Sequence, residues 1–191
     1  MKRKYKPKVS KITKQQKLTG ILGLFIISIM VLSALNFYDT SEKDNEYTYQ
    51  GKKFIRTENN LWTTYLPNKQ LTIISNPKDL ENISINYIPL NILNSMQKIY
   101  LSINPKDRNQ EALYELKRNI PLSPLVVTAC YEDNELCTEL PLKSCEDATD
   151  NIGVILLKES NLTKVEFKNN CLTIQGKELV KLVDKITLQQ I

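Results

Sequence analysis

Histidine is absent from this 191-residue sequence, and glycine occurs only five times. Without an imidazole, the chain has no Ser-His-Asp or Cys-His catalytic set and no histidine-based zinc site. The five glycines form neither a G-x-G-x-x-G sequence nor a Walker loop, so a nucleotide cradle is not expected. The sequence therefore predicts no cofactor and no metal. It leans away from an enzyme, although catalysis by carboxylates, lysine or tyrosine stays open.

Acidic residues are also missing from the first 17 positions. This segment carries eight basic residues, namely Lys2, Arg3, Lys4, Lys6, Lys8, Lys11, Lys14 and Lys17. The next twenty residues hold no charge, beginning with Leu18 and ending with Phe37. Twenty helical residues rise about 30 Å, which matches the hydrocarbon core of a bilayer. By the positive-inside rule, the N-terminus lies in the cytoplasm and the remainder of the chain lies outside.

The sequence therefore divides into four segments. We predict a basic cytoplasmic leader at 1–17, an uncleaved single-pass transmembrane helix at 18–38, a polar linker at 39–46 and an extracytoplasmic domain at 47–191. Two alternatives are a cleaved signal peptide and a pilin-like leader cut after Gly20. Beyond the leader, 18 basic residues face 21 acidic ones, a net charge of −3. The expected partner of the basic leader is anionic lipid, and nucleic acid is not an expected partner.

All the cysteines lie on the predicted outer side, at Cys130, Cys137, Cys145 and Cys171. An even number of cysteines in an oxidising compartment is typical of structural disulfides. Their spacing is too wide for the tight pairs of a zinc site, and no C-x-x-C redox motif is present. The four cysteines can form two disulfides in three ways, and the sequence does not decide between them. We expect a short Cys137–Cys145 loop together with a Cys130–Cys171 bridge.

The first half of the outer domain has the pattern of an antiparallel meander. Four short stretches rich in β-branched and aromatic residues, separated by Gly, Asn and Pro, fall within residues 47–74. Residues 77–96 break this pattern and predict a short helix or a loop.

The second half mixes helices with strands. Residues 98–103 and 125–129 predict strands on either side of a helix that Asp107 caps, which makes a βαβ unit. Further elements are expected as a strand at 152–157, a hairpin at 163–174 and a final helix after Gly176. The fold class is α+β, with a largely antiparallel sheet, the βαβ unit and a C-terminal helix.

Residues 132–150, called the acidic loop below, are the most strongly charged part of the outer domain. The loop contains seven carboxylates and one basic residue, Lys143, which gives a net charge of −6. Most such loops are simply solvated, but this one can also dock a cationic partner or bind calcium. No calcium-loop spacing is present. The candidate contact residues are Trp62, Glu132, Asp133, Glu135, Glu146, Asp147 and Asp150. Trp62, with its aromatic neighbours, predicts either a hydrophobic core or a platform for sugar or peptide.

Two glycosylation sequons would also face outward. They are Asn82-Ile83-Ser84 and Asn161-Leu162-Thr163, so Asn82 and Asn161 are candidate modification sites. Short sequons of this kind also arise by chance in a chain rich in asparagine.

Several of these features together resemble a group of uncharacterised small archaeal single-pass membrane proteins. The resemblance rests on the basic leader and single anchor, on Tyr49-x-Gly51-x-x-Phe54 and Trp62-x-Thr64, and on the spaced cysteines and the helix after Gly176. It implies archaeal surface placement, and it implies no activity.

The first hypothesis for function is a membrane-anchored, disulfide-stapled domain that binds an envelope protein or polymer, or assembles with it. A second hypothesis is a pilin-like or secretion-system structural subunit. A third is a cell-surface enzyme that works without histidine, which requires two carboxylates about 5–10 Å apart in a pocket.

Overall fold

The computed structural model describes residues 14–41, 45–120, 122 and 125–191, in two units divided between Asn45 and Glu46. The first thirteen residues of the predicted leader, and residues 42–44 of the predicted linker, lie outside this description. In the first unit, helix α1 spans Lys14–Ser41. Within the described residues, no helix meets both the length and the apolar character that a membrane crossing requires. The span at 18–38 stays a prediction from the sequence.

The second unit begins with the predicted antiparallel meander, which is confirmed. Its strands are β1 (Glu46–Tyr49), β2 (Lys52–Arg56), β3 (Trp62–Leu66) and β4 (Lys69–Ile73), hydrogen-bonded in chain order. The turn between β1 and β2 places Gln50 and Gly51 at positive φ, as a two-residue hairpin turn requires.

A second sheet of five strands lies in the same unit. Its strands are β5 (Lys98–Ile103), β6 (Val126–Cys130), β7 (Ile152–Glu159), β8 (Lys164–Lys168) and β9 (Cys171–Gly176). The order is β6-β5-β7-β9-β8, and only the β8–β9 pair is antiparallel. The α+β class and an antiparallel sheet are confirmed, but the expectation of one largely antiparallel sheet was wrong. The apolar runs of β6 and β7 are typical of parallel strands covered on both faces.

Three helices accompany the sheets: α2 (Leu90–Ser95), α3 (Gln110–Asn119) and α4 (Leu179–Thr187). Helix α3 connects the parallel neighbours β5 and β6, so the predicted βαβ unit is confirmed, as is the C-terminal helix. The predicted cap was wrong, because Asn109 and not Asp107 occupies the N-cap position of α3. Short 3-10 turns occur at η2 (Pro77–Leu80), η3 (Cys145–Asp147) and η4 (Leu188–Gln190).

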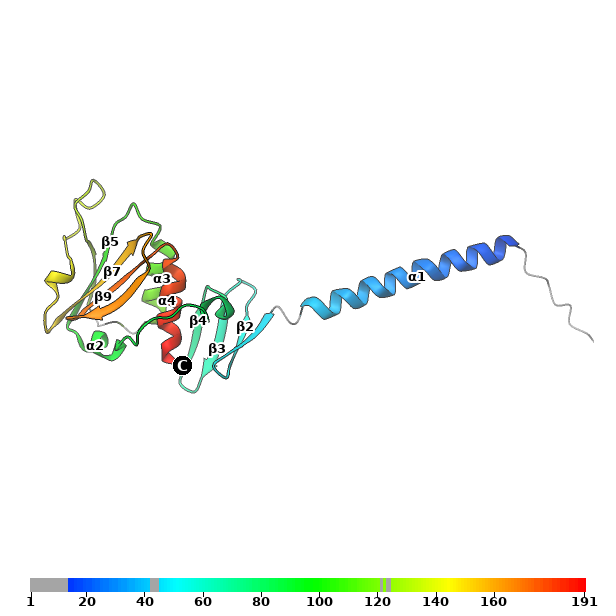
Figure 1. Ribbon diagram of the computed structural model, residues 1–191, viewed down its shortest axis with the longest axis horizontal. Coiled ribbons are helices and arrows are strands. Elements are labelled where there is room, and N and C mark those ends of the chain that lie inside the picture. Colours follow the sequence, from blue (N-terminus) through cyan, green and yellow to red (C-terminus); the bar gives the residue numbers. More distant parts are fainter. Residues whose placement is uncertain (1–13, 42–44, 121, 123–124) are drawn as a thin grey trace, which may run out of the picture. The chain divides into compact units, whose positions relative to one another are not determined.

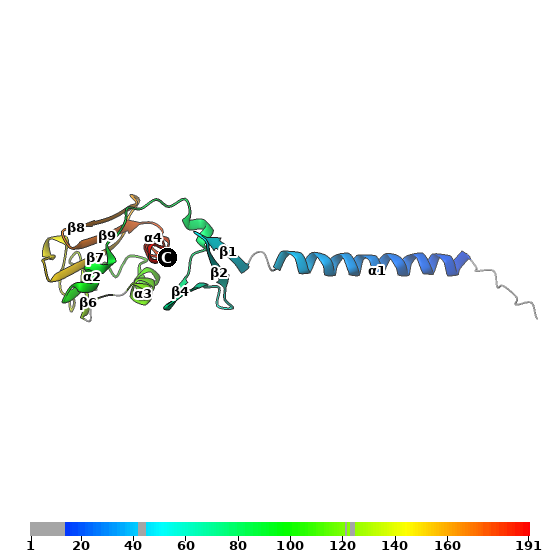
Figure 2. The same cartoon turned by 90° about the horizontal axis from the view of Figure 1, so that it is seen from below.

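Helices α3 and α4 form a layer between the two sheets, which Figure 1 and Figure 2 show from two directions. Leu116 of α3 and Leu182 of α4 belong to the core against the five-stranded sheet. A separate core under the meander contains Trp62 and Phe54, together with Leu188 from η4 just after α4. The helix layer therefore contributes to the packing of both sheets.

Candidate functional site

Polar side chains gather where the parallel strands β5, β6 and β7 reach their carboxyl ends. Asn104 follows β5, Tyr131 and Glu132 follow β6, and Glu159 is the last residue of β7. Open sheets with parallel strands commonly bind ligands at this edge, beside the point where the connections leave in opposite directions. Here β5 connects towards β6, while β7 connects towards β8 and β9, so that point lies between β5 and β7.

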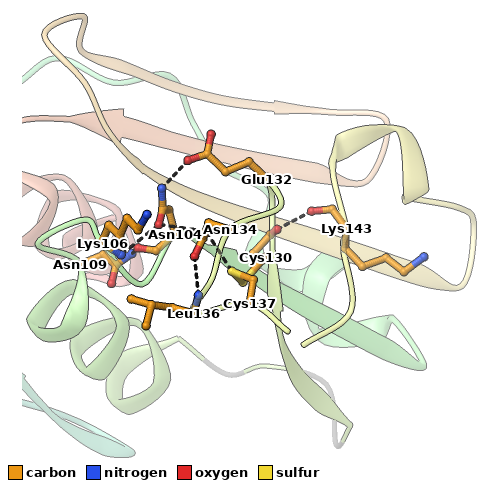
Figure 3. The surroundings of a disulfide bond; sticks show 10 residues. Asn104, Lys106, Asn109, Cys130, Glu132, Asn134, Leu136, Cys137 and Lys143 are labelled. Atoms are coloured by element: carbon orange, nitrogen blue, oxygen red, sulfur yellow. Dashed lines mark hydrogen bonds between the residues drawn. A yellow bond between two sulfur atoms is a disulfide. The ribbon is translucent and has the colours of Figure 1, made fainter. Parts of the chain in front are cut away.

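Asn104 is the centre of a hydrogen-bond network at this edge (Figure 3). Its side chain is only 6% exposed, and its amide nitrogen donates to a carboxylate oxygen of Glu132. Its Oδ1 accepts from the backbone N–H of Lys106 at 2.9 Å, and its backbone carbonyl accepts from Asn109 Nδ2 at 2.9 Å. Asn134 donates to Asn104 Oδ1 at 3.4 Å and to Cys137 Sγ at 3.1 Å. The network ties the start of the acidic loop to the end of β5.

Reciprocal hydrogen bonds join the segment that follows β5 to the carboxyl end of β7. Asp107 Oδ2 accepts from the Tyr131 hydroxyl at 2.9 Å and from the Glu159 backbone N–H at 3.0 Å. Glu159 Oε2 accepts in return from the backbone N–H of Arg108 at 3.0 Å. Burial, and next the hydrogen bond to Asp107, raise the pKa of Tyr131, which keeps its hydroxyl a donor. A cavity of about 340 Å³, which Asp107, Arg108, Gln110 and Glu111 line, remains beside the first turn of α3.

The disulfides are confirmed, but the expected pairing was wrong. Cys130 pairs with Cys137 and Cys145 pairs with Cys171, with Cα–Cα distances of 6.1 and 5.3 Å. Cys130 ends β6 and Cys171 begins β9, and two strands lie between them. Three strand spacings amount to about 14 Å, roughly twice the Cα separation that a disulfide tolerates. The two bonds fix both ends of the acidic loop to the five-stranded sheet.

Some acidic residues of the loop are held by hydrogen bonds, and Glu132 is one of these although it is exposed. Besides Glu132, Asp147 is tied, because it accepts from Lys143 Nζ and from the Ser144 backbone N–H, each at 2.8 Å. The hydrogen bond from Lys143 lowers the pKa of Asp147, so this carboxyl stays ionised. The remaining carboxylates among the candidates are exposed, namely Asp133, Glu135, Glu146 and Asp150. Two large apolar side chains of the same loop are exposed as well, Leu136 by 58% and Leu142 by 50%.

Trp62 does not join these residues. Its side chain is 4% exposed and belongs to the core under the meander, together with Tyr49 and Phe54. The aromatic residues there form a core, so Trp62 offers almost no surface to a sugar or a peptide.

The two sequons, far apart in sequence, meet at one cavity. Asn82 and Asn161 are both exposed, and they line a cavity of about 420 Å³. The sequon hydroxyls of Ser84 and Thr163 line it too, together with Lys177. A glycan on either asparagine would therefore extend beside or into this cavity.

A buried pair of carboxyl groups was missed from the sequence. Glu115 of α3 and Asp184 of α4 are both 0% exposed. Glu115 Oε2 accepts from Arg118 Nη2 at 2.6 Å, and Asp184 Oδ2 accepts from the Ser75 backbone N–H at 2.8 Å. The other oxygens, Glu115 Oε1 and Asp184 Oδ1, have no hydrogen-bond partner among the described residues.

A proton shared between these two carboxyls would supply the missing donor. Burial, followed by the charge of Asp184, raises the pKa of Glu115 to about 8 although Arg118 lowers it. Burial likewise raises the pKa of Asp184. The pair has no exposed surface, so it is out of reach of a substrate. The sequence signal was a carboxylate on or beside the apolar stripe of each helix, next to Leu116 and next to Val183.

Neither protein-family models, nor curated proteins, nor solved structures gave a match to this chain. The resemblance to small archaeal membrane proteins therefore stays a prediction. Across residues 14–41, 45–120, 122 and 125–191, no cluster of three or more carboxylates or cysteines is arranged to hold a metal ion.

Proposed function

We propose that this chain is a single-pass membrane protein whose domain lies outside the cytoplasm and binds another envelope component through the acidic loop. The observation that carries this proposal is the double attachment of that loop. Cys130–Cys137 fixes its first half, and Cys145–Cys171 fixes its second half. A loop held in this way loses little further conformational entropy when a partner binds, which favours affinity.

The membrane anchor is proposed on the sequence. Eight basic residues precede twenty uncharged ones, and this arrangement favours a cytoplasmic N-terminus. Two disulfides in the domain agree with an oxidising compartment, because thiols in the cytosol are kept reduced.

The chemistry of the loop indicates the kind of partner. Leu136 and Leu142 stand exposed among carboxylates such as Asp133, Glu135 and Glu146. Apolar side chains gain free energy when a partner removes them from water, while charges set the choice of partner and the rate of encounter. We therefore propose a partner with a basic and partly apolar polypeptide segment.

The proposed location of the domain outside the cytoplasm is tested on protein isolated from native membranes. Free thiols are blocked before the cells are lysed. We expect two closed disulfides and no blocked cysteine by mass spectrometry, and the protein should stay in the membrane pellet after carbonate extraction. Free Cys130 and Cys137, or release by carbonate, would contradict the proposed location. The same peptides show whether the chain before Gly20 is retained, and its loss would favour the pilin-like alternative.

The contact surface is tested by a photo-crosslinking amino acid in place of Leu136, with the same replacement at Leu162 as control. Leu162 is 67% exposed and lies outside the acidic loop, so it matches Leu136 in type and accessibility. We expect a discrete adduct of defined mass from position 136 and none from position 162.

Neutralising the loop should then remove that adduct. The variant combines Asp133→Asn, Glu135→Gln and Glu146→Gln, and its control is Glu58→Gln, an exposed carboxylate of the meander. If the adduct persists in the neutral loop, or forms equally at both leucine positions, the loop is not the contact surface.

A further inference from the structure

The two disulfides differ in their access to solvent. Cys130 is 0% and Cys137 3% exposed, and the Cys137 sulfur also accepts a hydrogen bond from Asn134. Cys145 is partly exposed, although its partner Cys171 is only 3% exposed. In the second bond, therefore, Cys145 is the more exposed of the two residues, and its sulfur lies 3.4 Å from the Thr173 hydroxyl.

Cys145 and Cys171 both line a groove on the face of the five-stranded sheet that faces away from α3 and α4. The groove has a volume of about 380 Å³, which suffices for a small thiol or for one side chain of a protein. Its other lining residues include two lysines and two glutamates, namely Lys164, Glu166 and Lys168 of β8 and Glu146 of the acidic loop, together with Thr173 of β9. Disulfide exchange requires a thiolate to approach one sulfur directly, so an open groove beside Cys145 permits the reaction.

The register between β8 and β9 places a lysine residue on the strand next to Cys171. Lys168 lies directly opposite Cys171 in the antiparallel register. Side chains opposite each other in such a pair point to the same face, with Cβ atoms about 4.5–5.5 Å apart. An ammonium group near a cysteine stabilises its thiolate, and a more stable thiolate leaves faster during exchange. Lys164 lies opposite Gln175, four residues along β9 from Cys171, and pairs with Glu166 at 2.6 Å.

From this geometry we propose that Cys145–Cys171 is a thiol–disulfide exchange site for a small thiol or a dithiol protein. An incoming thiolate forms a bond to Cys145 Sγ, the S–S bond breaks, and Cys171 leaves as a thiolate beside the Lys168 ammonium. A second thiolate, from the same dithiol or from another small thiol, attacks the incoming sulfur and releases Cys145. The chain is reduced by two electrons, the reductant becomes a disulfide, and both cysteines take up protons.

Opening this bond removes the covalent attachment of the second half of the acidic loop and leaves that half held by hydrogen bonds such as Asn170 Nδ2 to the Thr149 carbonyl at 3.0 Å. Cys130–Cys137 stays closed, and the backbone of Lys143 stays joined to Cys130 by the hydrogen bond at 2.8 Å. Exchange at Cys145 would therefore change the shape of the loop without releasing β6. This chemistry needs no partner at Leu136 or Leu142. A failure of the exchange experiment would therefore not contradict the proposed contact surface, and a failure of the crosslinking experiment would not contradict the exchange site.

The test follows both disulfides of the purified full chain in non-ionic detergent. The protein is incubated with reduced glutathione, samples are quenched with iodoacetamide, and each cysteine is quantified by mass spectrometry. We expect Cys145–Cys171 to open about tenfold faster than Cys130–Cys137, with glutathione attached to Cys145 in the intermediate. Equal rates, earlier opening of Cys130–Cys137, or glutathione on Cys171 would overturn the proposal.

A pair of lysine variants separates the role of charge from mere accessibility. Lys168→Gln removes the ammonium opposite Cys171, whereas Lys164→Gln removes an ammonium from the same groove and strand. We expect opening to slow about threefold in Lys168→Gln and to stay unchanged in Lys164→Gln. If both variants react like the wild-type chain, or slow equally, Lys168 does not stabilise the leaving thiolate and the proposed step is wrong.

Discussion

Replacing Glu115 by glutamine should remove most of the dependence of the domain's stability on pH between pH 5 and 8. The folded protein holds the pKa of Glu115 at about 8, against an ordinary value of 4.5. Between these two values the folded state binds one more proton than the unfolded state. Raising the pH through this window therefore favours the unfolded state, by about 1.4 kcal/mol per pH unit.

The stability conferred by the protonated carboxyl is complete below pH 4.5 and is lost as the pH rises through about 8. From pH 5 to pH 8 we expect the wild-type free energy of unfolding to fall by about 3–4 kcal/mol. Glutamine has the shape of the protonated acid and donates a hydrogen bond in the same direction, but it does not titrate. In the Glu115→Gln variant we therefore expect a change below about 1 kcal/mol over the same range.

The groups that form hydrogen bonds with Glu115 and Asp184 lie on three segments of the chain. Helix α3 contributes Arg118 and Asn119, which both donate to Glu115, helix α4 contributes Asp184, and the segment after β4 contributes the Ser75 N–H. Urea unfolding of the full chain in non-ionic detergent, with disulfides intact, measures the effect. The buried Trp62 is the only tryptophan and reports the transition by fluorescence.

Glu111→Gln is the matched control, because Glu111 lies on the same helix but is exposed. This control should keep the wild-type pH dependence. A flat wild-type curve, or a Glu115→Gln curve as steep as the wild-type one, would refute the assignment of a shared proton to this pair.

Three further changes have defined expectations, all measurable by the same urea titration. Arg118→Leu removes the donor to the Thr72 carbonyl at 2.8 Å and to Glu115 at 2.6 Å, and should cost about 1–3 kcal/mol at both pH 5 and pH 7, because Glu115 is largely protonated at both. Phe54→Ala empties a fully buried position under the meander and should cost about 3–5 kcal/mol. Asn170→Ala removes a side chain that tolerates φ +61° better than alanine does and that donates to the Thr149 carbonyl at 3.0 Å, and should cost about 1–2 kcal/mol, with Asn170→Gly costing less.

Local patterns in the sequence predicted most of the elements. Alternating β-branched and aromatic residues identified the meander, and helical spacing around Leu116 identified α3 between two strands. These signals depend on neighbours within a few positions of the chain, where turn chemistry and periodicity act directly. The hairpin of β8 and β9 was predictable for the same reason.

Pairings between distant segments were not predictable in this way. The parallel position of β7 beside β5 depends on where the acidic loop returns the chain, and no local pattern encodes that position. The disulfide pairing followed from the same arrangement, because the strand order separates Cys130 from Cys171. Similarly, the sequence left two interpretations open for Trp62, because its burial depends on distant residues such as Leu80 and Leu188 that pack in the same core.

The buried polar contacts explain why the meander has a defined position on the helix layer. Apolar surfaces slide over one another at small cost, since the hydrophobic effect has no direction. Hydrogen bonds are directional, so they do not permit the sheet to slide over the helices in this way. The Ser75 N–H donates to Asp184, Arg118 donates to the Thr72 carbonyl, and Lys185 donates to the Leu80 carbonyl at 2.7 Å. A shift of the sheet would break these bonds and leave charged groups buried without partners, which is far more costly than a lost apolar contact. The carboxyl pair thus contributes to the position of the meander on the helix layer, through Asp184 and through the Arg118 that Glu115 holds.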